Sequence, residues 1–290
     1  MTRVARKSML AAGIAASLAL VSLAPTLARE PDDGVIVGRG SYVRYLYPAS
    51  LLENSASQQY MALKQQANSK QALLPPNHQS VERLRRIAKD LLPFADKWNP
   101  RSKEWKWEVV AIRSDNINAF CMPGGKIAFF TGIMDKLQLT DDEVAIVMGH
   151  EIAHALREHA RARAVKSTVT NVAGRVIGAL IFGQAGEVIG AQSAGLLTLK
   201  FSRDDEKEAD LVGMELAARA GFNPAAGVTL WQKMSAASKG APPQWMSTHP
   251  AGETRIQLIK DHLKEVEGLY ERARTAKAQG GTPPLPAQKN

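Results

Sequence analysis

Residues 140–156 read TDDEVAIVMGHEIAHAL, and this stretch decides the fold that we expect for the chain. Thr140 and Glu143 make a capping-box pattern, which predicts that a helix begins here. The residues that follow are apolar on nearly every side of such a helix, and a helix of that kind is buried. We therefore expect a long buried helix that begins at Thr140 and ends near Val165.

Two histidines, His150 and His154, lie four residues apart in this expected helix. The spacing places both rings on one face, so both can bind the same metal ion. Glu151 is offset by roughly 100° and can contact a water on the metal rather than the metal itself. Two solvated histidines are the alternative, but buried histidines need a partner that satisfies them. The motif predicts a catalytic zinc site with Glu151 as general base.

A catalytic zinc ion takes three protein ligands and leaves a fourth position for water or substrate. A third histidine six residues after His154 is excluded, because Ala160 occupies that position. His159 lies about 140° from His154 around the expected helix, so the two cannot share a face. We expect His159 to be a surface or packing histidine.

The remaining source of a third ligand is the acidic stretch SRDDEKEAD at residues 202–210. Glu206 and Asp210 are four residues apart on an expected helix, so one can bind zinc while the other accepts the second N–H of a ligand histidine. Acidic residues are also common in a first helical turn, where they interact with the helix dipole. The spacing alone leaves both Glu206 and Glu208 open as the ligand.

The first 28 residues have the order of a secretory signal peptide. Cations at residues 3–7 precede an apolar run at residues 9–24, and small residues lead to Ala28, where we expect cleavage. An uncleaved N-terminal anchor is one alternative, and an organelle transit peptide is another, although a transit peptide would be amphipathic. Cys121 is the single cysteine, which excludes an internal disulfide and a lipid-modified cysteine at the cleavage point.

The 290-residue chain has a formal net charge of +9, and its basic residues are scattered. Because no run of Lys and Arg is interleaved with aromatic residues, we do not expect nucleic-acid binding. The positive charge leaves affinity for anionic membrane surfaces open.

The rest of the sequence predicts one α+β domain over residues 29–276, with its catalytic core at about 105–258. Alternating apolar residues predict a small antiparallel meander within the core. Residues 172–198 are rich in Gly and Ala and predict buried packing or a mobile flap rather than a membrane-dipping hairpin. A disordered tail is expected at 277–290. Further helices are expected at 51–73, 81–98 and 252–276, and strands at 105–111, 117–122 and 127–131.

Four blocks of the sequence together resemble one family of zinc metallopeptidases. That family includes the CAAX prenyl protease, HtpX, the mitochondrial Oma-type protease and the periplasmic BepA and LoiP proteases. The order and joint presence of the blocks are far more specific than the histidine motif alone. The blocks are NAFCMPGG at 118–125, HEIAH at 150–154, Arg203 with EKEAD at 206–210, and STHP at 247–250.

The resemblance implies a mostly helical, zincin-like fold of the gluzincin type and assigns further roles. It implies Glu206 as the third ligand and Asp210 as the partner of His150. It also implies that one strand forms the edge of the cleft, where an extended substrate pairs through its main chain. The residues expected to bind substrate are Asn118, Ala119 and Arg255.

His249 matches a histidine that lies near the metal in the periplasmic members of this family. There it either stabilises the oxyanion or occupies the open zinc position. Pro250 restricts His249 to an extended backbone, which is consistent with a loop residue aimed at a site. An ordinary loop histidine is the alternative.

We therefore expect an exported, periplasmic endopeptidase with one zinc ion per chain, which cuts unfolded or misassembled cell-envelope proteins as part of protein quality control. The sequence shows none of the multiple transmembrane helices of the prenyl protease and HtpX branches, so prenylated substrates are not expected. One alternative is a latent, chaperone-like factor that binds the same clients in the same cleft. Another is a structural zinc protein, but such a site needs no general base.

Overall fold

The computed structural model describes residues 34–171, 200–238, 243–249 and 253–286. The expected signal peptide at 1–28 and the Gly- and Ala-rich segment at 172–198 lie outside the described residues, so both interpretations stay predictions. Residues 279–286 form no helix or strand. No helix in the described ranges combines the length and the apolar character that a bilayer crossing requires.

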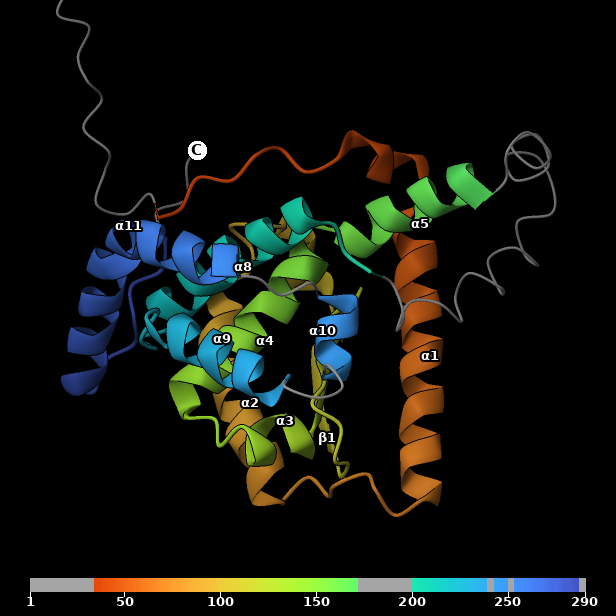
Figure 1. Cartoon of the computed structure of the whole chain (residues 1–290), viewed down its shortest axis with the longest axis horizontal. Helices are drawn as coiled ribbons and strands as arrows, with labels where there is room; N and C mark the ends of the chain where they lie inside the picture. The colour runs from red at the N-terminus through yellow and green to blue at the C-terminus, as the bar shows by residue number, and fades with distance from the viewer. Residues whose placement is uncertain (1–33, 172–199, 239–242, 250–252, 287–290) are drawn as a thin grey trace, which may run out of the picture. The chain divides into compact units, whose positions relative to one another are not determined.

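Helices make up most of the described chain, and a small sheet accompanies them (Figure 1), which confirms the α+β class. The first expected helix ends early, because Gln71 adopts a left-handed conformation with φ of 52°. The second changes to a 3-10 turn that contains Pro93. The helices are α1 (Ala49–Ser69), α2 (Gln79–Leu91), α3 (Thr131–Lys136), α4 (Asp141–Leu156), α5 (His159–Asn171), α8 (Arg203–Arg219), α9 (Ala226–Ala237), α10 (Gln244–Thr248) and α11 (Glu253–Ala278), with 3-10 turns η1 (Tyr42–Leu46), η2 (Leu92–Phe94) and η3 (Pro100–Glu104).

Helix α4 begins with the predicted capping box. The Thr140 hydroxyl accepts from the backbone N–H of Glu143 at 3.3 Å, and the Glu143 carboxylate accepts from the backbone N–H of Thr140 at 2.9 Å. Every residue from Glu143 to Leu156 is buried. The expectation of a helix that is buried on all sides is therefore confirmed for α4.

The end of α4 differs from the prediction of one helix to Val165. Helix α4 ends at Leu156, Glu158 takes a left-handed conformation with φ of 57°, and α5 begins at His159. The left-handed residue changes the direction of the chain, so residues before and after it no longer follow one helical repeat.

Two glycines allow α4 and α8 to pack backbone against backbone. A Cβ atom on Gly149 would lie 2.7 Å from the backbone oxygen of Gly213, and a Cβ on Gly213 would lie 2.6 Å from the backbone nitrogen of His150. Only glycine permits such a close approach. The contact places the histidine-bearing turn of α4 directly against α8.

The sheet contains β1 (Glu108–Ile112), β2 (Ala119–Met122) and β3 (Lys126–Phe130), and its order is β1-β3-β2. Strand β2 is antiparallel to β3, as expected, but β1 is parallel to β3, so the sheet is mixed and not an antiparallel meander. The chain reaches the other edge of β1 before the sheet begins: Leu73 forms a bridge to Ile112 there. Among the described residues, β2 pairs only with β3 and is an edge strand.

Candidate metal centre

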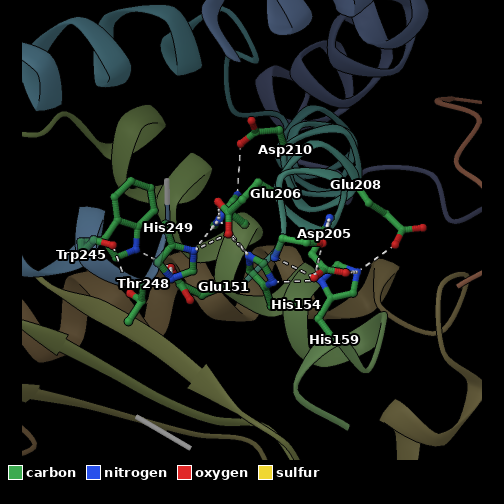
Figure 2. A network of polar contacts seen from close by, with 12 residues as sticks. Glu151, His154, His159, Asp205, Glu206, Glu208, Asp210, Trp245, Thr248 and His249 are labelled. Atoms are coloured by element: carbon green, nitrogen blue, oxygen red, sulfur yellow. Dashed lines mark hydrogen bonds and ion pairs between the residues drawn. The ribbon is translucent and has the colours of Figure 1, made fainter. Parts of the chain in front are cut away.

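Four buried side chains meet at one place in the structure. His150 and His154 come from α4, Glu206 comes from α8, and His249 directly follows α10; Figure 2 labels the last three. One possible ligand atom from each residue lies within 4.8 Å of the others. Each residue is at most 3% exposed. The structure thus brings the three predicted ligands together with His249.

The distances among these atoms suit a four-coordinate metal ion. The Nε2 atoms of His150 and His154 are 3.0 Å apart, and Glu206 carboxylate oxygens lie 3.5 and 3.4 Å from them. His249 Nδ1 is 3.3 Å from His150 Nε2 and 3.1 Å from Glu206 Oε1. Tetrahedral ligands about 2.0–2.1 Å from a central ion lie roughly 3.3–3.4 Å from one another. The five separations, from 3.0 to 3.5 Å, are thus close to those expected around one metal ion.

The surroundings shift the pKa values of the cluster in different directions. Burial lowers the pKa of His150, but its hydrogen bonds with Asp210 and Glu206 outweigh burial and raise the pKa to about 9. Burial holds the pKa of His154 well below its usual value. Burial also favours the neutral form of Glu206, yet hydrogen bonds from the three histidines hold its pKa far below the usual range. The shifts favour an ionised carboxylate at Glu206 and a neutral imidazole at His154, and both forms can bind a cation.

Asp210 lies behind His150, as the resemblance implied. Its Oδ1 is 3.1 Å from His150 Nδ1, an arrangement that directs the Nε2 lone pair of His150 toward the centre of the cluster. Arg255, which was expected to bind substrate, lies against two carboxylates of the cluster. Its guanidinium is buried and donates to Asp210 at 2.6 Å and to Glu206 at 2.6 Å. These contacts link Arg255 to the carboxylates of both α8 residues, and a role in substrate binding stays a prediction.

Glu151 lies beside the four ligand atoms and has a partner that the sequence did not reveal. The indole N–H of Trp245 donates to Glu151 Oε1 at 2.6 Å, and the side chain of Glu151 is buried. The Trp245 ring also stacks on the His249 ring at a centroid distance of 4.9 Å. Trp245 lies four residues before His249 and just outside the STHP block, and that proximity is the one sequence signal that could have found it.

A pocket opens between the cluster and the outer edge of β2. Residues 118–123 line one side, and Glu151, His154 and His249 line the other. Asn118 and Ala119 therefore lie at the cleft, where they were expected. A chain lying along β2 would place its backbone next to Glu151.

Glu208 turns away from the four ligand atoms. Its carboxylate accepts from His159 Nε2 at 2.8 Å and from Arg157, whereas Glu206 lies inside the cluster (Figure 2). The geometry thus selects Glu206 from the two candidates that spacing left open. His159 is buried and its Nδ1 lies 2.9 Å from His154 Nδ1. The expectation that the two histidines could not share a face assumed one continuous helix, but α4 ends before His159 and the two rings meet.

Several known metalloproteases are similar to this chain. It is 35% identical over 153 residues to the mitochondrial metalloendopeptidase OMA1 of Arabidopsis thaliana, covering 53% of this chain and 31% of the relative. It is 29% identical to the metalloprotease LoiP of Escherichia coli, covering 69% and 77%. It is 35% identical to a putative beta-barrel assembly-enhancing protease of Vibrio cholerae, covering 54% and 35%.

The chain spans less than two thirds of the length of the first mitochondrial relatives that it matches. A family model described as "Peptidase family M48" matches residues 78–263, which include both histidine-bearing parts of the cluster and Glu206. That match covers well over half of the sequence and all four blocks on which the resemblance rested. The chain belongs to peptidase family M48.

Proposed function

We propose that this chain is a zinc-dependent endopeptidase. The observation that carries the proposal is the convergence of four buried side chains that can bind a metal, with the carboxylate of Glu151 beside them. A structural zinc site would also show four ligands, but it would not need a buried carboxylate directed at the cluster from the same helix. The M48 membership and the metalloendopeptidase relatives support the same conclusion.

In this proposal, His150, His154 and Glu206 hold one zinc ion. When bound, zinc polarises water and a substrate carbonyl, and it lowers the pKa of that water to about 7. Glu151 accepts the proton from the attacking water and later delivers it to the leaving amine. The indole N–H of Trp245 fixes one oxygen of Glu151, which leaves the other for proton transfer. The outer edge of β2 binds the substrate backbone.

His249 supports a resting state with little turnover. Its Nδ1 lies 3.3 Å from His150 Nε2 and 3.1 Å from Glu206 Oε1, close enough to take the fourth corner of a tetrahedral zinc site, which is the position that water needs for hydrolysis. In this proposal, His249 leaves that corner when substrate enters. The same observation favours the second candidate function, a client-binding factor whose proteolysis stays latent.

The proposed substrates are unfolded or misassembled proteins of the cell envelope, and the proposed location is the periplasm. The signal-peptide pattern of residues 1–28 supports export. The edge strand supports extended clients, because folded proteins rarely offer a free strand. The LoiP and beta-barrel assembly-enhancing relatives are bacterial, whereas the OMA1 relatives are mitochondrial, so location is tested directly by fractionating cells. Contact with a membrane surface stays a prediction.

Glu151→Gln tests the enzymatic proposal. The variant should fold and bind one zinc ion but lose casein cleavage by several orders of magnitude, because the general base is removed while the ligands stay. Glu267→Gln, an exposed change on α11, is the matched control and should leave cleavage unchanged. Appreciable cleavage by Glu151→Gln would reject the mechanism. Comparing the envelope proteomes of cells with wild-type protein and with Glu151→Gln would identify the substrates.

A further inference from the structure

A second polar network lies behind His154 and takes no part in the proposed chemistry. His154 Nδ1 is 2.9 Å from His159 Nδ1, and His159 Nε2 is 2.8 Å from Glu208 Oε2. Figure 2 shows the three side chains in a row that leads away from the cluster. His154 and His159 are each 3% exposed. The row is therefore a buried connection and not a chance surface contact.

Two neutral imidazoles beside one carboxylate allow one arrangement of the hydrogen atoms in this row. The Glu208 carboxylate, which is paired with Arg157, acts only as an acceptor, so His159 Nε2 is the donor. A neutral imidazole that carries its proton on Nε2 has an acceptor at Nδ1. His154 must then donate from Nδ1, which leaves the lone pair of its Nε2 directed at the metal cluster. Each contact in the row thus favours the form of His154 that binds a metal.

We propose that His159 and Glu208 are positioning residues, which hold His154 in the orientation and tautomer that bind the metal. This inference rests on the proposed zinc site. Metal-bound histidines usually give their second N–H directly to a carboxylate or a carbonyl. His150 follows that pattern with Asp210. At His154 a second histidine, His159, lies between the ligand and the carboxylate of Glu208. We call this arrangement of His154, His159 and Glu208 the relay.

The surroundings hold this row in place at both ends. Arg157 binds Glu208 and donates to the backbone oxygen of Gly38 at 2.6 Å. At the other end, the ring of Phe201 stacks on His154 at a centroid distance of 4.0 Å. Asp205 is the competing carboxylate, but its oxygen is 3.9 Å from His159 Nε2 and it caps α8 through Ser202. Glu208 is therefore the partner that completes the row.

The break after α4 explains why His159 can reach His154. In one continuous helix these residues would lie on different faces. The left-handed Glu158 starts a new helix at His159 and brings its ring back toward His154. The chain order HEIAHALREH thus supplies the ligands and a supporting histidine from adjacent turns.

Three variants of the full chain test the relay through zinc affinity, measured by competition with a chromophoric chelator. His159→Phe keeps the ring shape but removes both nitrogens, and it should weaken zinc binding by about 10–100-fold. His159→Gln keeps an acceptor oxygen and an N–H donor, and it should stay within about threefold of wild type. His262→Phe, on α11, is the matched control and should have no effect.

The variants distinguish positioning from packing. Equal zinc affinity in His159→Phe and wild type would overturn the relay, and so would a His159→Gln variant as weak as His159→Phe. A wild-type protein that binds no zinc would reject the proposed zinc site and the relay together. Failure of the relay alone would appear as normal zinc stoichiometry with no difference among the variants.

A measurement on the wild-type protein covers the case in which His159→Phe does not fold. Nitrogen-15 NMR of histidine-labelled, zinc-loaded protein reports which ring nitrogen carries each proton. We expect His159 to carry its proton on Nε2 and His154 to carry its proton on Nδ1. A proton on His159 Nδ1 would reverse the direction of the row and overturn the proposal.

Discussion

The residues of the metal centre come from helices of very different length and capping. His150, His154 and Glu206 project from α4 and α8, helices of 16 and 17 residues that both begin with complete capping boxes. His249 and Trp245 belong to the region of α10, which has five residues and no side-chain cap. The long helices also pack through Gly149 and Gly213. The difference indicates that two long helices position the three ligands, whereas His249 is positioned by side-chain contacts with Trp245, His150 and Glu206.

The largest effect is expected for the ligands on α4 and α8. Glu206→Gln should weaken zinc binding by more than about a hundredfold, because it removes a charged ligand and not merely a supporting contact. Metal analysis after gel filtration and chelator competition measure the change. Undiminished zinc occupancy would place the third ligand elsewhere, and Glu208 would be the first residue to test.

A smaller effect is expected for His249, the residue that follows the short helix α10. His249→Ala should retain zinc and raise self-cleavage and the cleavage of folded bystander proteins, because the fourth corner becomes free for water. Cleavage rates of wild type and variant on casein and on a folded protein measure this. A loss of about a hundredfold in turnover would instead assign His249 to stabilisation of the oxyanion. Wild-type activity on every substrate would show that it has neither role.

The close packing of α4 against α8 predicts that a larger residue at their contact lowers the stability of the protein. Gly213→Ala places a methyl group 2.6 Å from the backbone of His150, so the helices must separate, at a cost of about 1–3 kcal/mol. Denaturant unfolding measures the change. Gly268→Ala on α11 is the control, because its new methyl meets only the end of the Arg272 side chain, at 3.4 Å. Similar losses of unfolding free energy in both variants would mean that the α4–α8 contact is no more sensitive to a methyl group than the surface of α11.

The smallest effect concerns the cap of α4 and depends on pH. Burial raises the pKa of Glu143, but hydrogen bonds from Lys233, Thr140 and Thr229 outweigh it, so the pKa is lowered. A lowered pKa in the folded state gives stability that is present above the unfolded pKa of about 4.3 and is lost as the pH falls through the folded value. Glu143→Gln should therefore cost about 1 kcal/mol at pH 7.

The pH series provides the check on this last prediction. The difference in unfolding free energy between wild type and Glu143→Gln should shrink below about pH 4, as the wild-type carboxylate takes up a proton. A difference that stays constant from pH 7 to pH 3 would show that the charge of Glu143 does not stabilise α4.

The sequence predicted best where one helix carried the whole signal. The capping box, the burial of α4 and the approach of His150 and His154 all follow from spacing within that helix. The resemblance to M48 peptidases then implied Glu206, Asp210 and the edge strand at Asn118. These features depend on short motifs, which keep their meaning without knowledge of the remaining fold.

The features that the sequence missed depend on where chains turn. The parallel pairing of β1 with β3 follows from how residues between the strands cross, and alternation within a strand does not contain that information. His159 was misplaced because a left-handed residue at Glu158 carries no sequence signal as strong as glycine. The contacts of Arg255 with Asp210 and Glu206 could not be predicted either, because a residue's place in the sequence says nothing of the direction in which its side chain points.

The edge strand β2 has only four residues, Ala119–Met122. At about 3.3 Å per residue, it offers a bound chain roughly 13 Å of pairing, enough for only a few main-chain hydrogen bonds. Such a short contact would select segments that are extended and unpaired, and it would depend little on the amino-acid sequence of the segment. A cleft of this kind would recognise conformation: a polypeptide qualifies by having lost its own partners, whatever residues it contains.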